Sequence, residues 1–228
     1  LRPSQQFQTV DSRYNHLVYD LAPAGKKALS QAAKWSDRSG PNGGPWWHKF
    51  MISSITASVE LTTIKRSDVS YIPQARILDR AGAQLDSMIE YLDPTSKKMV
   101  KKKLCPDALF GLEYHTGAGS RFRFFVVEAD RSTEPLTTSA YCRKSVTRSF
   151  AQYQAYVSTG AYKRHLSLTA PLLVLQVTNC KKRQEAMTRA LGQTAQGWDY
   201  VLFYHLEAFS EPTCIPGPET FLLYEPWE

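Results

Sequence analysis

The sequence predicts an α/β sandwich in which helices flank a mixed central sheet. From residue 104 onward the predicted elements follow the order strand, strand, helix, strand, helix, strand, which is typical of this class. Of the 228 residues, 43% are apolar and 12% aromatic, enough for one sizeable core or for one domain plus an appendage. No apolar run approaches the roughly 20 residues of a membrane span, and no secretory pattern opens the chain, so we expect a soluble cytoplasmic protein without membrane contact.

The first 40 residues predict the end of a domain that begins upstream. Residues 17–21 are a short apolar strand, and Pro23 suits the first turn of the helix that follows. Residues 36–45 are rich in Gly, Pro and Ser and predict a linker. We therefore expect a domain boundary near residue 40, with residues 1–40 on one side and residues 41–228 on the other.

After this linker, residues 46–66 predict an amphipathic helix that lies against a sheet. Its apolar stripe has helical spacing and includes Met51, Ile55 and Val59. The next stretch is ambiguous, because residues 71–80 are compatible with a short strand or a loop. Residues 81–92 predict either a loop with a strand or a helix turn.

The clearest element is a hairpin over residues 104–130, in which two apolar runs flank the turn sequence HTGAGS. A regular hairpin centred between Gly117 and Ala118 pairs residues whose numbers sum to 235, and so places Asp107 opposite Glu128. Alternation puts Asp130 on the same face as Glu128, on a strand that is apolar on both faces and therefore predicted to be buried.

The remaining elements follow in order. Residues 139–164 carry helical spacing, residues 171–179 are a short buried strand, residues 180–191 are a helix and residues 198–209 are another strand.

Asp107, Glu128 and Asp130 form a candidate three-carboxylate cluster. Like charges that face each other across a hairpin are destabilising unless something neutralises them, and unpartnered carboxylates are costly to bury. One solution is a hard divalent cation such as Mg²⁺, which takes oxygen ligands. The other is pairing with nearby basic residues, namely Lys101 to Lys103, Arg121 or Arg131.

The charge balance predicts a polyanionic partner, with DNA the first candidate. The formal net charge is +7 and the isoelectric point is near 9.2. Part of the excess lies in two runs, residues 97–103 and 181–183. The candidate phosphate contacts are Lys101, Lys102, Lys103, Arg131, Lys181, Lys182 and Arg183. The four cysteines are widely spaced, which favours free thiols over a metal site or disulfides.

The chain resembles the PD-(D/E)xK superfamily, which has the restriction-endonuclease-like fold. The resemblance lies in CPDALF, in VVEAD about twenty residues later, and in a helix with the pattern Q-x-x-x-Y. It implies that Asp107 and Glu128 bind Mg²⁺ or Mn²⁺, while Gln152 and Tyr156 support the site. Asp130 stands where the superfamily has a lysine that activates water; Arg131, Lys144 or Arg148 could replace it.

A narrower resemblance covers residues 16–205. The stretches PDALFGLEY, FRFFVVEADRSTEPL, AQYQAYVSTGAYKRHL and PLLVLQVTNCKKRQEAM are similar to the replication-relaxation family of plasmid and mobile-element proteins, in which an Asp at the third position is usual. Members usually begin with a winged helix-turn-helix. The stretch LVYDLAPAGKKAL resembles the last strand and the closing helix of that domain. The expected fold is therefore a restriction-endonuclease-like sandwich after the remnant of a winged helix.

Two functions follow from the resemblance. In the first, the protein processes DNA: Asp107, Glu128 and Asp130 hold Mg²⁺, and Lys144 or Arg148 faces the charge that develops on phosphorus. In the second, it is a non-enzymatic DNA-binding accessory or regulator whose nuclease-like domain serves for docking or dimerisation. Either function allows a relaxase or replication protein as partner, and a homodimer.

Two further residues of the 46–66 helix have competing interpretations. His48 suits a packing or capping role beside two tryptophans, or a catalytic one. Glu60 lies off the apolar stripe, and would be an additional acid of the site in the superfamily arrangement.

Overall fold

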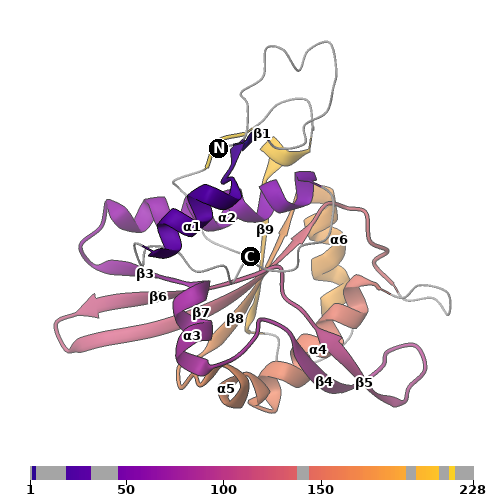
Figure 1. Cartoon of the computed structure of the whole chain (residues 1–228). Coiled ribbons are helices and arrows are strands. Elements are labelled where there is room, and N and C mark those ends of the chain that lie inside the picture. Colours follow the sequence, from indigo (N-terminus) through magenta and orange to yellow (C-terminus); the bar gives the residue numbers. More distant parts are fainter. Residues whose placement is uncertain are drawn as a thin grey trace, which may run out of the picture.

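A five-stranded mixed sheet forms the centre of the protein (Figure 1). The computed structural model describes residues 2–3, 19–31, 46–137, 144–193, 199–210 and 216–218. The strand order is β3-β6-β7-β8-β9, with β7, β8 and β9 parallel, β6 antiparallel to β7, and β3 antiparallel to β6. The strands are β3 (Val69–Pro73), β6 (Ala108–Thr116), β7 (Gly119–Asp130), β8 (Leu172–Thr178) and β9 (Val201–His205). The predicted mixed α/β architecture is confirmed.

The hairpin of β6 and β7 has the predicted register. Its ladder runs from Ala108 opposite Val127 to Thr116 opposite Gly119, and the numbers in each pair sum to 235. The ladder ends one pair before Asp107, whose N–H still donates to the Val127 carbonyl oxygen at 3.0 Å. Asp107 therefore lies directly before β6, at the edge of the sheet where β7 ends.

Helix α2 (Trp46–Ile64) covers one face of the sheet, as its apolar stripe predicted (Figure 1). Met51 and Ile55 are completely buried, and they belong to one apolar cluster with Phe110 of β6 and Val127 of β7. Glu60 is exposed on this helix. The apolar period of α2 thus positions the N-terminal end of this helix, including His48, close to the site described below.

The other face is covered by α3 (Gln74–Ala81), α4 (Val146–Ser158), α5 (Ala161–Leu166) and α6 (Lys181–Gly192). The predicted helix over residues 139–164 is two helices in the described part of this range, because Gly160 adopts a left-handed conformation with φ 66° between them. Phe150 and Tyr153 of α4 have no exposed surface and pack into the second apolar cluster. The strand β7 is accordingly buried on both faces between Phe124 and Val127.

A separate two-stranded hairpin consists of β4 (Ser87–Leu92) and β5 (Met99–Leu104), and β4 packs against α4. Sequence analysis predicted no strand at β5, which stood out only as a basic run. It gave a strand or loop for residues 71–80, and this was wrong for α3: β3 ends at Pro73, and α3 runs from Gln74 to a left-handed cap at Gly82.

At the N-terminus, β1 (Arg2–Pro3) pairs with β2 (Tyr19–Asp20), and α1 (Pro23–Gln31) follows. The predicted strand over residues 17–21 contains β2, and the predicted helix at Pro23 is α1. The winged-helix interpretation and the division at residue 40 stay predictions, since residues 36–45 lie outside the described part. A 3₁₀ turn, η2 (Glu207–Phe209), follows β9. None of the described helices has the length and apolar character needed to cross a membrane.

Candidate functional site

The candidate site lies at one edge of the sheet, where β7 and β8 end and β6 begins. Asp107 precedes β6, while Glu128 and Asp130 close β7. Gln176, near the end of β8, is the register partner of Glu128. Ligands commonly bind beyond the carboxyl ends of parallel strands, because side chains from neighbouring strands converge there. The topology thus brings the three predicted acids to one place.

These acids line a small cavity of about 110 Å³, which we call the acidic cavity. It lies between the sheet edge, α2, α4 and α6. Its lining residues are His48, Cys105, Asp107, Glu128, Ala129, Asp130, Arg131, Thr133, Glu134, Lys144, Val146, Ser149, Gln176 and Met187.

Asp107 is held from two directions. Its Oδ2 accepts a hydrogen bond from the Ala129 N–H at 2.8 Å, and its Oδ1 lies 3.2 Å from Nε2 of His48. His48 therefore reaches the site from α2, the helix that covers the other face of the sheet from α4 and α6. Within the part of the chain that the structure describes, Asp107 has no ion pair with a lysine or arginine.

Glu128 is held by Tyr153, whose hydroxyl group donates a hydrogen bond to Oε1 of Glu128. Burial raises the pKa of Glu128 well above its ordinary value, and the negative charge of Asp107 raises it further; the bond from Tyr153 and the charge of Lys144 act in the opposite direction. Burial and the neighbouring Glu128 likewise raise the pKa of Tyr153. Burial and the neighbouring Asp107 therefore make the charged form of the Glu128 carboxyl group costly.

Asp130, in contrast, is already neutralised. Nε of Arg183 donates to Oδ2 of Asp130 at 2.5 Å, and the Ser132 N–H donates to Oδ1 at 3.0 Å. Arg183 also donates to the Glu134 carbonyl oxygen at 2.6 Å. The pairing with basic residues that the sequence left open is thus present for this one acid, but its partner comes from α6 and not from residues 101–103, Arg121 or Arg131.

The described residues contain no group of three or more His, Cys, Asp and Glu side chains arranged to hold a metal ion. Both side-chain oxygens of Asp130 have partners within the protein. Of the three predicted acids, Asp107 and Glu128 are thus left facing the acidic cavity, which Glu134 also lines.

Gln176 is a functional candidate that sequence analysis missed. Only 3% of its surface is exposed, it lines the acidic cavity, and its Nε2 has no hydrogen-bond partner among the described residues. Buried amides are nearly always paired, so an unpaired one beside a polar cavity suggests a ligand or water there. The signal in the sequence was a single glutamine within an otherwise apolar strand.

Tyr153 supports Glu128, a role that the resemblance assigned to Tyr156. Tyr156 lies away from both acids, with its hydroxyl 2.7 Å from Nδ1 of His165. Tyr153 is a buried core residue, and its hydroxyl group donates to Glu128. The apolar stripe of α4 could have indicated this contact, because a buried tyrosine hydroxyl requires a partner and this stripe covers the face that carries Glu128.

The other predicted catalytic residues have different surroundings. Lys144 lines the acidic cavity with 84% of its side chain exposed, and its Nζ lies 3.8 Å from Oε1 of Glu134. Arg148 instead donates from Nε to Oδ2 of the buried Asp93 at 2.9 Å. Gln152 donates to the Lys103 carbonyl oxygen at 3.2 Å.

A second cavity of about 270 Å³ adjoins the first and lies between β5 and α4; we call it the basic cavity. It shares Glu128, Lys144 and three further residues with the acidic cavity. Its lining residues are Tyr91, Lys102, Lys103, Leu104, Cys105, Glu128, Glu134, Lys144, Ser145, Arg148, Ser149 and Gln152.

The predicted phosphate contacts are spread over several elements. Lys101, Lys102 and Lys103 lie exposed on β5, and the last two line the basic cavity. Lys181 and Lys182 are exposed at the start of α6, away from both cavities. Their contact with phosphate stays a prediction.

Fold and site together define an α/β protein with an acidic cavity at the carboxyl edge of its mixed sheet. The chain belongs to the replication-relaxation family, whose model matches residues 1–171, about three quarters of its length. This membership suggests a role in the replication or mobilisation of plasmids or mobile elements. No curated protein and no solved structure matches the chain. Asp107, Glu128 and Tyr153 lie within the matched range, whereas Gln176 and Arg183 follow it.

Proposed function

We propose that this protein binds and processes DNA, and that the acidic cavity is a Mg²⁺-dependent phosphodiester hydrolase site of the PD-(D/E)xK kind. One observation carries the proposal. Asp107 and Glu128 converge on a cavity, close to Lys144, and neither acid has a lysine or arginine ion-pair partner among the described residues. Acids that served only the fold would be closed off by such partners, as Asp130 is.

The residues at the cavity fit a metal held by two carboxyl groups. Mg²⁺ and Mn²⁺ accept one or two protein carboxylates, with water and phosphate oxygens completing the shell. Asp107 and Glu128 supply this pair, and the raised pKa of Glu128 is the effect that a neighbouring divalent cation would reverse. Asp130 does not fit a ligand role, because Arg183 and Ser132 occupy its oxygens.

A bound metal of this kind would polarise the scissile phosphate and lower the pKa of a water molecule. The chain itself fixes the acids: the Ala129 N–H orients Asp107, and Tyr153 orients Glu128. Lys144 is placed to stabilise negative charge on the phosphate. In the absence of the superfamily lysine, the imidazole of His48 lies at the cavity and could accept the proton of water.

A second candidate function is a DNA-binding accessory or regulatory protein that has lost hydrolysis. The ion pair between Arg183 and Asp130 favours it, because the third position of the motif is then part of the fold. A relaxase, a replication protein or a second copy of the chain would be the partner of such a module.

The deciding experiment is a cleavage assay with supercoiled plasmid and linear single-stranded DNA in Mg²⁺ or Mn²⁺. We expect products that vanish with EDTA and fall at least about 100-fold in Glu128→Gln and Asp107→Asn. Glu128→Gln keeps an oxygen for the Tyr153 hydroxyl, so the fold should persist. Glu90→Gln, an exposed acid on β4, is the matched control and should cleave normally. Intact DNA that is shifted on a gel would favour the accessory protein, and cleavage unchanged in Glu128→Gln would refute the assigned site.

A further inference from the structure

The basic cavity has a composition that suits phosphate groups. Four basic side chains line it, against two acids, Glu128 and Glu134, at the wall that it shares with the acidic cavity. The basic residues are Lys102, Lys103, Lys144 and Arg148. At about 270 Å³ it is close to the lower end of ligand-binding cavities, roughly 300 Å³, and so suits a group smaller than a drug-sized molecule.

Two of these cations are already used by the fold. Nζ of Lys103 lies 2.6 Å from Oδ2 of Asp86, and Arg148 is paired with Asp93. Lys102 forms no ion pair within the described part of the chain, and Lys144 is largely exposed at 3.8 Å from Glu134. Lys102 and Lys144 are therefore the charges that remain for a ligand, one on each side of the cavity.

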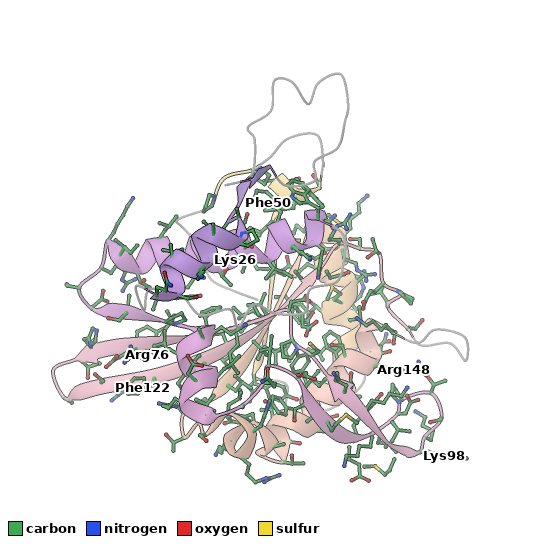
Figure 2. The ribbon with its side chains drawn as sticks, viewed as in Figure 1. Lys26, Phe50, Arg76, Lys98, Phe122 and Arg148 are labelled. Carbon is green, nitrogen blue, oxygen red and sulfur yellow. The ribbon has the colours of Figure 1, made fainter. Side chains whose placement is uncertain are left out.

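The walls of this cavity are held in place before any ligand binds. Asp93, which is 2% exposed, accepts hydrogen bonds from the N–H groups of Thr95 and Ser96 and also pairs with Arg148. These bonds tie the turn of the β4–β5 hairpin to α4, and Figure 2 shows Arg148 on α4 beside this hairpin. The bond from Gln152 to the Lys103 carbonyl oxygen adds a second tie, to β5 itself. A site that is fixed in this way avoids the entropy cost of ordering loops upon binding.

The two cavities are neighbours in a way that suits a continuous strand. Because they share Glu128, Lys144 and Ser149, a polymer with phosphates at regular intervals could place one phosphate at the acids and the next among the lysines. At about 270 Å³ the basic cavity has room for part of one strand and is too small to enclose a double helix.

We infer that the basic cavity binds the phosphate adjacent to the scissile one in an unpaired DNA strand, with Lys102 and Lys144 as its main contacts. The inference rests on the proposed function, since it identifies the substrate of that site as single-stranded DNA. Arg148 is a positioning residue, which keeps the hairpin on α4.

Neighbouring lysines of β5 provide a matched test. Lys102 lines the cavity. Lys101, the preceding residue, is also exposed, but it lies opposite Glu90 and does not line the cavity. Lys102→Gln and Lys101→Gln therefore remove the same charge from the same strand. Binding is measured by fluorescence anisotropy with a labelled single-stranded oligonucleotide and with its duplex, in EDTA so that no cleavage occurs.

We expect the wild type to bind the single strand more tightly than the duplex. Lys102→Gln should weaken that binding about 3- to 10-fold and reduce the slope of log K against log salt by about 0.7, the value for one lost contact to a single strand. Lys101→Gln should stay within about twofold of the wild type. Thermal melting of both variants confirms that the fold is intact.

Equal losses in the two variants, tighter binding of the duplex, or no DNA binding by the wild type would overturn the inference. The outcome is separable from that of the cleavage assay. If the protein cleaves DNA with metal but both lysine variants weaken binding equally, the phosphate-binding role of the basic cavity is refuted and the hydrolase site is not. A selective effect of Lys102→Gln without any cleavage would support the cavity while refuting hydrolysis.

Discussion

Replacing Arg183 by methionine should destabilise the protein by about 3 kcal/mol. Arg183 and Asp130 are only 12% and 9% exposed, so the change leaves a carboxylate nearly buried without its cation. Removing one partner of a buried ion pair typically costs about 3–5 kcal/mol. The Ser132 N–H continues to donate to Asp130 and moderates this cost, while the lost bond to the Glu134 carbonyl oxygen adds about 1 kcal/mol. These opposing contributions favour the lower end of the range.

Urea denaturation measures this prediction through the midpoint of unfolding, provided that the slope of the transition is unchanged. Lys182→Met is the matched control, because Lys182 is the preceding residue and is exposed; it should change the free energy of unfolding by less than about 0.5 kcal/mol. Adding Asp130→Asn to Arg183→Met removes the uncompensated charge and should restore at least about 1 kcal/mol. A loss below about 1 kcal/mol in Arg183→Met would refute the assignment of Asp130 to the fold.

Two further predictions concern the site and the hairpin. Because the folded protein raises the pKa of Glu128, the native state binds more protons than the unfolded chain above the ordinary pKa of 4.5. The free energy of unfolding should therefore fall as pH rises above this value, by at most about 1.4 kcal/mol per pH unit. Urea titrations at pH 5 and 7.5, both in EDTA, measure this fall, and Glu128→Gln should remove it. The same fall in Glu128→Gln as in the wild type would contradict the prediction. Gly111→Ala should lower the free energy of unfolding by about 1–3 kcal/mol in the same assay, because the new Cβ would lie 2.8 Å from a ring carbon of Phe124 and 3.2 Å from Cβ of Ile72. Gly192→Ala is the control and should cost nothing, because a Cβ at Gly192 would meet no neighbouring residue within 4 Å.

The hairpin could be predicted residue by residue because its information is local. Alternation of apolar residues and the turn at Gly117 fix the register, and the register alone brings Asp107 to the end of β7. The helix α3 was missed for the opposite reason. It has eight residues, of which only Ile77 and Leu78 are buried, so its apolar period is too short to recognise. The strand β5 was missed because only its Leu104 is buried, so its side chains predict an exposed segment. Pairing with β4 is what makes this segment a strand.

The candidate site shows the same division between local and distant information. The convergence of Asp107 and Glu128 follows from the hairpin and was predicted. The pairing of Asp130 with Arg183 joins residues 53 positions apart, and it depends on how the first turn of α6 packs beside β7. The choice of Tyr153 over Tyr156 depends on the rotation of α4 against the sheet, and a Q-x-x-x-Y pattern carries no information about that rotation.

The energetics of Glu128 bear on whether the site is a relic. A carboxyl group whose pKa is raised by burial and by a neighbouring acid destabilises the fold at neutral pH, so stability alone gives no reason for a glutamate at this position. Asp130 lies two residues away in the same strand and shows the alternative, a carboxylate with a cationic partner. His48 from α2 and Tyr153 from α4 hold the two open acids from opposite faces of the sheet, and this requires both layers to be packed. An arrangement that is costly and yet held so firmly is expected where a cation binds, because the cation removes the cost.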